Sequence, residues 1–150
     1  MSVADACPLC REDGGEILWQ DEQCRLVLVA DVDNPGCCRV IWQRHVAEMT
    51  DLDLTERQHL MAVVFAAEKA LRTTARPDKI NLASLGNVVP HLHWHVIPRW
   101  RDDRHFPNAV WGPALRDPPR DPLRDSNDRP AVTGAALRDA FVQSLAGERA

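Results

Sequence analysis

The segment Pro90-His91-Leu92-His93-Trp94-His95-Val96-Ile97-Pro98-Arg99 is the most informative part of the chain, because histidines and apolar residues alternate in it. Successive side chains of a β-strand point to opposite faces. The alternation therefore predicts a strand from His91 to Arg99, with His91, His93 and His95 on one face and apolar residues on the other. Three imidazoles are costly to bury without partners, so we expect this face to be functional.

Two kinds of chemistry suit such a face. Imidazoles two residues apart on a strand can share a metal ion. Neutral imidazole is also a good nucleophile, and a pKa of about 6.5 leaves much of it unprotonated near neutral pH. Neighbouring imidazoles can then donate hydrogen bonds to phosphate oxygens. The alternation alone leaves both a metal site and covalent catalysis on phosphorus open.

The segments upstream of the histidines predict an α+β fold with antiparallel pairing. Apolar runs separated by turn-forming residues predict strands over residues 16–20, 24–30, 37–43 and 79–84. Between the last two, apolar residues recur near the helical period behind a capping-box spacing at Thr55–Gln58. We therefore expect a long helix packed on the sheet, with His59 on its exposed side.

The composition changes after residue 112. Residues 1–112 are predicted to form one domain, and residues 113–130 are predicted to be an irregular linker rich in Pro, Arg and Asp. Residues 131–150 predict a C-terminal helix with Thr133 as its N-cap. One face of this helix is apolar and contains Leu137, Phe141 and Leu145. That face must pack on the domain or on a partner subunit.

Length and charge exclude several classes of protein. The chain has 150 residues and a net charge of −4, from 18 Lys and Arg against 22 Asp and Glu. This balance argues against a basic surface for duplex nucleic acid. No apolar run approaches the roughly 20 residues that span a bilayer, and the first residues lack the pattern of a signal peptide. We therefore expect a cytoplasmic protein without a membrane segment.

The histidine segment and its flanks resemble the histidine triad (HIT) family of nucleotide hydrolases and transferases. The resemblance rests on the His-x-His-x-His pattern of residues 91–95, on Gly86-Asn87-Val88-Val89 before it, on Pro98-Arg99 after it, and on Pro35-Gly36 with the strand that ends at His45. It covers roughly residues 7 to 112. It implies the HIT fold, a purine nucleotide or dinucleotide substrate, no obligatory organic cofactor and a homodimer.

The resemblance also implies catalytic roles. His93 matches the nucleophile that attacks an α-phosphate and forms a nucleotidyl-histidine intermediate. His95 matches the residue that contacts the phosphate and the leaving group, and His91 matches a supporting position. The reaction implied is hydrolysis or nucleotidyl transfer from a nucleotide phosphoramidate or a dinucleoside polyphosphate. The alternative is a non-catalytic nucleotide- or metal-binding module with the same fold.

Three further residues are expected by resemblance to bind the nucleotide. Asn81 matches a polar residue that helps to hold the phosphates, and Asn87 stands where the family usually has glutamine. Asp31 is the nearest match to the residue that holds the ribose. Because the turn that follows it looks shortened, Asp33 or Asn34 can serve instead.

The segment that follows the histidines permits two interpretations. Residues 100–107 form either a solvated loop or the rim of the active site, with Arg99, Arg104 or His105 near the phosphates. Trp111 is expected either at a dimer contact or in the core of one subunit.

The five cysteines do not suggest a disulfide framework, because their number is odd and no export signal accompanies them. Cys7 and Cys10 have the spacing of zinc ligands, although two reduced thiols or a redox pair are the alternatives. In HIT proteins that carry such a pair, two histidines complete a structural zinc site. The matching positions here are His45 and His91.

Overall fold

The computed structural model describes residues 6–118 and 129–148 and is built around one antiparallel sheet. The five strands lie in the order β1-β2-β3-β5-β4. Their bounds are β1 (Glu16–Gln20), β2 (Cys24–Leu28), β3 (Cys38–Trp42), β4 (Lys79–Ala83) and β5 (His93–Arg99). All neighbouring pairs are antiparallel, so the predicted α+β class and antiparallel sheet are confirmed.

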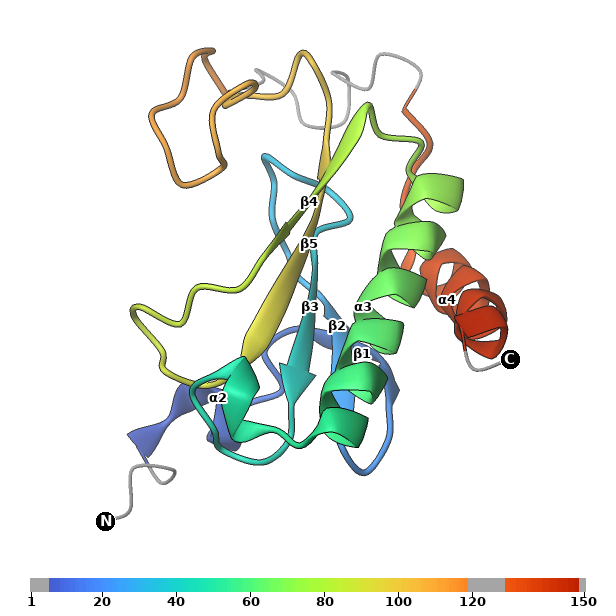
Figure 1. Cartoon of the computed structure of the whole chain (residues 1–150). Coiled ribbons are helices and arrows are strands. Elements are labelled where there is room, and N and C mark those ends of the chain that lie inside the picture. The colour runs from blue at the N-terminus through green and yellow to red at the C-terminus, as the bar shows by residue number, and fades with distance from the viewer. Residues whose placement is uncertain (1–5, 119–128, 149–150) are drawn as a thin grey trace.

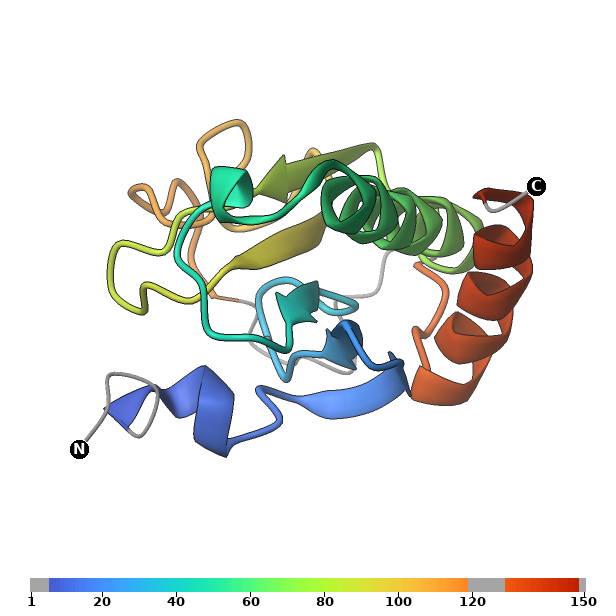
Figure 2. The ribbon, with the colours of Figure 1, turned by 60° about the horizontal axis from the view of Figure 1, so that its bottom comes forward.

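The two long helices cover one face of this sheet. Helix α3 (Leu54–Thr74) packs against β2, β3 and β5, and α4 (Gly134–Glu148) lies beside α3 (Figure 1). The short helix α2 (Pro8–Arg11) lies on the other side of the sheet from α3, as Figure 2 shows. A 3-10 helix, η1 (Met49–Asp51), precedes α3. The N-terminal segment therefore packs on the face of the sheet opposite α3, where Cys7 and Leu9 cluster with Val27 and Ile41.

The main core lies between the sheet and the long helices. Leu26, Val40 and Val96 project from neighbouring strands into one buried cluster with Leu60 and Val64 of α3. The predicted apolar face of α4 joins the same cluster through Leu137, Phe141 and Leu145. The C-terminal helix thus packs on α3 and β1 of its own chain.

The beginning of α3 differs from its prediction. The N-cap is Asp53, whose carboxylate accepts a hydrogen bond from the Glu56 backbone N–H at 2.8 Å, while the Glu56 carboxylate accepts one from the Asp53 backbone N–H at 2.9 Å. The capping box expected at Thr55–Gln58 is therefore wrong by two residues, because an aspartate already stands three positions before Glu56. His59 is also not a surface residue, because it is half-buried beside Asp21 of the β1–β2 turn.

Strand β5 begins two residues later than predicted, at His93 rather than His91. The His91 N–H donates to the Val89 carbonyl at 2.8 Å, and the Leu92 N–H donates to the Val46 carbonyl at 2.7 Å. These bonds lie outside the β3–β5 ladder. His91 therefore stands in a bend before the strand, and its own contacts set the direction of its ring.

Most of the predicted linker, residues 119–128, lies outside the described residues. Residues 113–118 and 129–133 contain neither helix nor strand. Thr133 precedes α4, and its hydroxyl accepts a hydrogen bond from the Ala136 N–H at 3.2 Å. In the described part of the chain, no helix combines the length and the apolarity that crossing a bilayer requires.

Candidate active site and metal cluster

The His93 ring is oriented by the backbone just before it. His93 is 9% exposed, and its Nδ1 lies 2.6 Å from the carbonyl oxygen of His91. A carbonyl only accepts hydrogen bonds, so Nδ1 carries the hydrogen and Nε2 of the neutral ring keeps a lone pair. The first residue of β5 therefore presents one nucleophilic nitrogen in a fixed tautomer.

His95 lies two residues further along the same face of β5. Its ring meets that of His93 nearly edge-on, with the ring centroids 4.9 Å apart. On its other side it meets the ring of Trp111 at 5.0 Å. Burial, together with the nearby His93 and Arg39, lowers the pKa of His95 to about 4. His95 is therefore neutral at pH 7 and offers one donor nitrogen and one acceptor nitrogen.

Arg39 adds a positive charge to this face and was missed by the sequence analysis. It stands directly opposite His95 in the β3–β5 ladder, so the two side chains share a face. Its Nε is buried and has no hydrogen-bond partner among the described residues. A planar guanidinium in this position suits a phosphate oxygen. The available signal was an arginine between the apolar residues of a core strand.

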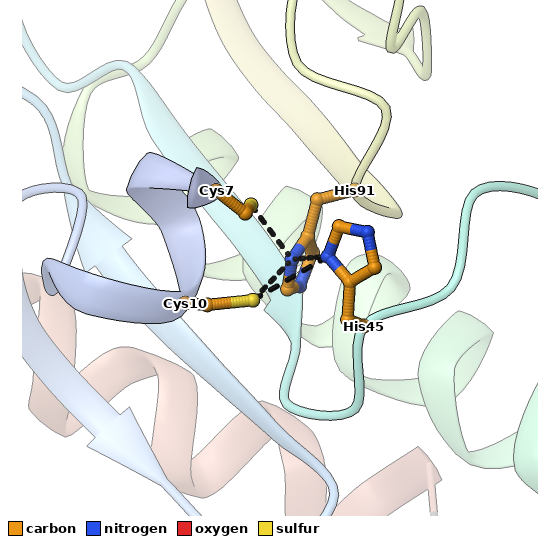
Figure 3. A group of neighbouring side chains, drawn as sticks. All are labelled: Cys7, Cys10, His45 and His91. Carbon is orange, nitrogen blue, oxygen red and sulfur yellow. Dashed lines mark hydrogen bonds between the residues drawn. The ribbon is translucent and has the colours of Figure 1, made fainter. Parts of the chain in front are cut away.

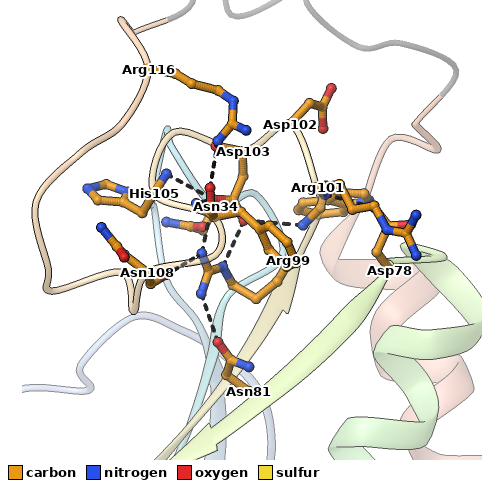
Figure 4. A network of polar contacts seen from close by, with 12 residues as sticks. Asn34, Asp78, Asn81, Arg99, Arg101, Asp102, Asp103, His105, Asn108 and Arg116 are labelled. Carbon is orange, nitrogen blue, oxygen red and sulfur yellow. Dashed lines mark hydrogen bonds and ion pairs between the residues drawn. The ribbon is translucent and has the colours of Figure 1, made fainter.

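A buried ion pair between Arg99 and Asp103 holds the segment that follows β5 (Figure 4). Arg99 Nε donates to Asp103 Oδ2 at 2.7 Å and Nη2 donates to Oδ1 at 3.1 Å, with the two side chains 2% and 0% exposed. Arg99 also donates to the Asn81 side-chain oxygen at 2.8 Å and to the Asn108 carbonyl at 2.8 Å. Asp103 further accepts from the backbone N–H groups of Trp100, His105 and Phe106.

This network argues against the solvated-loop interpretation of residues 100–107, and the active-site rim stays a prediction. Burial would raise the pKa of Asp103, but the hydrogen bonds from Arg99 and the backbone outweigh it and lower that pKa. The ionised Asp103 anchors the segment, so it is not a solvated loop. Arg99 forms the ion pair with Asp103, and Arg104 forms an ion pair with Asp33 at 3.1 Å. Trp111, which is 54% exposed, lies against His95 rather than in the core.

The residues expected to bind the nucleotide lie on different elements around β5 and the segment that follows it. Asn81 is tied to the histidine strand through Arg99. Asp31 uses its Oδ1 to accept the N–H groups of Asp33 and Asn34, both at 3.0 Å, and so shapes the turn between β2 and β3. Asn34 is buried, and its Oδ1 has no hydrogen-bond partner in the described part of the chain. Asn87 is exposed in the loop between β4 and β5.

His91 belongs to a separate cluster on the same side of the sheet (Figure 3). Its Nε2 lies 2.6 Å from the Trp42 carbonyl, so Nε2 carries the hydrogen and Nδ1 keeps the lone pair. That Nδ1 lies 3.4 Å from Cys7 Sγ, 3.4 Å from Cys10 Sγ and 3.3 Å from His45 Nδ1. The four ligand atoms all lie within 4.8 Å of one another.

Two sulfurs and two imidazole nitrogens are a donor set for tetrahedral zinc. The residues fit the ion because the Trp42 carbonyl holds His91 in the tautomer whose lone pair faces the sulfurs. Burial is the largest cause that lowers the pKa of His91, and a neutral ring is the form that binds metal. The structure therefore brings together all four residues that the sequence predicted.

Arg25 holds the two cysteines in place, and the sequence analysis missed it. Its buried guanidinium donates to the carbonyls of Leu9, Glu12 and Asp13 and to the Gln43 side chain, at 2.7 to 3.1 Å. These bonds tie α2, which carries Cys10, to β2. An arginine whose partners are mostly backbone carbonyls leaves no pattern in a sequence.

Comparison with known proteins agrees with this architecture. A family model described as the HIT domain matches residues 11–102. An AP-4-A phosphorylase of Mycobacterium tuberculosis (strain CDC 1551 / Oshkosh) is 34% identical over an 85-residue alignment that covers 53% of this chain and 44% of that protein. The match thus spans less than half the length of that relative.

Solved structures share the fold. A histidine triad protein from Marinobacter aquaeolei VT8 is 26% identical, with a TM-score of 0.67 over 87% of this chain and 91% of that one. One from Bradyrhizobium japonicum is 25% identical, with a TM-score of 0.63 over 91% of each chain. A Zn-bound histidine triad family protein from Mycobacterium smegmatis is 23% identical, with a TM-score of 0.64 over 96% of this chain and 99% of that one. The predicted HIT-like fold is confirmed.

His95 should make the folded protein sensitive to acid. Its pKa in the folded state is about 4, below the ordinary 6.5, so the unfolded chain takes up this proton at a higher pH. The contribution to stability is complete above pH 6.5 and is lost as the pH falls towards 4. Between pH 7 and pH 4.5, the wild type should lose about 2 kcal/mol more unfolding free energy than His95→Asn. Urea unfolding at both pH values measures this difference, and equal losses would contradict it.

Proposed function

This chain belongs to the HIT family, and we propose that it cleaves a nucleotide phosphoramidate or a dinucleoside polyphosphate at the α-phosphate. The observation that carries the proposal is the contact between His93 Nδ1 and the His91 carbonyl, which leaves Nε2 with its lone pair. The relative named AP-4-A phosphorylase supports a purine dinucleotide as the substrate class.

The proposed reaction has two in-line steps. In the first, the lone pair of His93 Nε2 forms a bond to the α-phosphorus, and the bond to the leaving group breaks with its electron pair departing on that group. The positive charge of the nucleotidyl-histidine is stabilised by the Nδ1–H bond to the His91 carbonyl. In the second, the oxygen of water or of another acceptor forms a bond to the phosphorus and loses a proton, which balances the proton taken up by the leaving group, and the bond to His93 Nε2 breaks with its electron pair returning to that nitrogen. His95, neutral at pH 7, can donate a hydrogen bond to the leaving group.

Arg39 supports a leaving group that carries negative charge. Its guanidinium shares a face with His95, the residue beside the departing atom in this proposal. A polyphosphate leaving group carries several negative charges, whereas the ammonia released from a phosphoramidate carries none. We therefore propose that Arg39 favours dinucleoside polyphosphates over phosphoramidates.

His93→Asn tests the nucleophile. The variant should lose about a thousandfold or more of its turnover with both adenosine phosphoramidate and diadenosine tetraphosphate, because no nitrogen lone pair remains to attack phosphorus. Chromatography of the released nucleotide measures the loss, and thermal unfolding checks that the variant is folded. The bond between phosphorus and a histidine nitrogen is labile in acid, so acid quenching is unsuitable. The nucleotidyl-histidine adduct of the wild type should therefore be sought by mass spectrometry after alkaline denaturation.

Unchanged turnover in His93→Asn would remove His93 from the mechanism. A wild-type protein that binds the nucleotide without turning it over would instead be the non-catalytic module with the same fold. A wild type that loses activity together with a metal bound by His93 or His95 would favour the metal interpretation of the histidine strand.

Arg39→Gln tests the selectivity. Its kcat/KM for diadenosine tetraphosphate should fall about tenfold more than its kcat/KM for adenosine phosphoramidate, because a charge-assisted hydrogen bond to the leaving phosphate is lost. Arg44→Gln is the matched control, since Arg44 is exposed and pairs with Glu56. Equal losses for the two substrates in Arg39→Gln would show that Arg39 does not select the leaving group.

The proposal includes a structural zinc ion held by Cys7, Cys10, His45 and His91. The fixed tautomer of His91 and the two sulfurs that face its Nδ1 support this assignment. When bound, the ion would join α2, the segment after β3 and the bend before β5 into one unit.

Elemental analysis of protein purified without added metal tests this ion. Cys10→Ser should hold about one equivalent of zinc less than the wild type, because one of the two sulfur ligands is gone. Cys37→Ser is the control for a cysteine-to-serine change, since Cys37 lies outside the cluster. A wild type with less than about a tenth of an equivalent of zinc would count against the ion.

A cytoplasmic homodimer completes the proposal. β4 is an edge strand of the sheet, and the backbone groups on its outer side can pair with the same strand of a second chain. The sheet would then continue across two subunits. The cytoplasm is supported by the cysteines, all five of which are unbridged, because that compartment keeps thiols reduced.

A further inference from the structure

A cluster of three potential ligands lies on the other face of the sheet, away from His93. Asp21 lies in the turn between β1 and β2, Cys24 begins β2, and His59 lies on α3. Their ligand atoms all lie within 4.8 Å of one another. His59 Nε2 is 2.8 Å from Asp21 Oδ2 and 3.8 Å from Cys24 Sγ. We propose that these three residues form a second metal site, which binds Zn²⁺.

The geometry differs from that of a hydrogen-bonded Cys-His-Asp triad. In such a triad the two ring nitrogens face different partners, whereas here Nε2 of His59 faces both the carboxylate and the sulfur. One imidazole nitrogen carries a single hydrogen or a single lone pair, so it serves one of these partners well and the other poorly. A cation placed where Asp21 Oδ2, Cys24 Sγ and His59 Nε2 converge would be bound by all three atoms at once.

The carboxylate is already oriented for this role. Asp21 Oδ1 accepts the backbone N–H groups of Gln23 and Cys24, both at 2.9 Å, and this directs Oδ2 towards His59. Such hydrogen bonds to the second oxygen commonly orient a ligating carboxylate. Cys24 is 0% exposed, while the side chains of His59 and Asp21 are 16% and 28% exposed. The ion therefore has a buried sulfur below it and an opening to solvent above it.

The donor set indicates which metal binds. Thiolate and imidazole favour zinc and similar transition metals, whereas magnesium and calcium favour oxygen ligands. One thiolate and one carboxylate neutralise the two charges of Zn²⁺, and the thiol proton is released to solvent on binding. Three protein ligands leave one tetrahedral position for water. The bound ion would join the β1–β2 turn to α3.

Cobalt titration of chelator-stripped protein tests the site, because Co²⁺ replaces zinc and shows a sulfur-to-metal absorption band. The full-length wild type should bind about two equivalents. In the double variant Cys7→Ser, Cys10→Ser, where the first cluster has no sulfur, we expect about one equivalent and a remaining band from Cys24. Adding Asp21→Asn or His59→Gln to this background should weaken cobalt binding at least about tenfold.

Asp21→Asn is the sharper of the two substitutions. The amide oxygen of asparagine can still accept the backbone hydrogen bonds that shape the turn, but the anionic ligand is lost. Cys37→Ser in the same background is the matched control and should keep the band, since Cys37 is buried outside the cluster.

Absence of a band in the double variant, or a band that neither Asp21→Asn nor His59→Gln weakens, would overturn the proposal. Should the double variant not fold, wild-type crystals soaked in ZnCl₂ give the answer by anomalous scattering. A peak between Asp21, Cys24 and His59 would support the site, and a peak at the first cluster alone would contradict it. Neither readout depends on nucleotide turnover.

Discussion

Two short hydrogen bonds from imidazole rings to backbone carbonyls determine what this face of the sheet can do. His91 Nε2 lies 2.6 Å from the Trp42 carbonyl, and His93 Nδ1 lies 2.6 Å from the His91 carbonyl. Each bond fixes a tautomer, and the two tautomers are opposite. His91 therefore keeps its lone pair on Nδ1, facing the cysteines, and His93 keeps its lone pair on Nε2. One residue, His91, thus contacts the cysteine cluster with its ring and orients the His93 ring with its carbonyl.

The same arrangement connects the cysteine cluster to β5. Because His91 stands in a bend before β5, its backbone is not held by the β3–β5 ladder, whose pairs begin with Ile41 and His93. The contacts that hold this bend are the bond from the His91 N–H to the Val89 carbonyl, the contact between the His91 ring and the Trp42 carbonyl, and the ring's neighbours in the cysteine cluster. An ion in that cluster would restrict the carbonyl to which His93 donates. The cysteine cluster and the His93 ring are therefore linked through one residue, His91.

The sequence alone predicted the features that follow from residue spacing within a short segment. The alternation of β5, the apolar stripe of α4 and the ligand spacing of Cys7 and Cys10 all correspond to observed elements or clusters. The sequence did not predict the buried arginines whose hydrogen-bond partners are backbone carbonyls of residues distant in the chain. Arg25 and Arg99 are both buried, and their partners include carbonyls that carry no side-chain identity. Arg39 was overlooked because its role follows from cross-strand register rather than from its neighbours in the chain.

These buried arginines also explain how a small sheet keeps a polar face ordered. Arg25 fixes the N-terminal segment at one end of the face, and Arg99 fixes the segment after β5 at the other. Each has its charge matched by carbonyls or by Asp103, so burial leaves few donors without partners. Arg39 lies between them with its Nε unmatched among the described residues. This donor without a partner lies on the same face as His95, and it is the feature from which we propose that the face binds a phosphate.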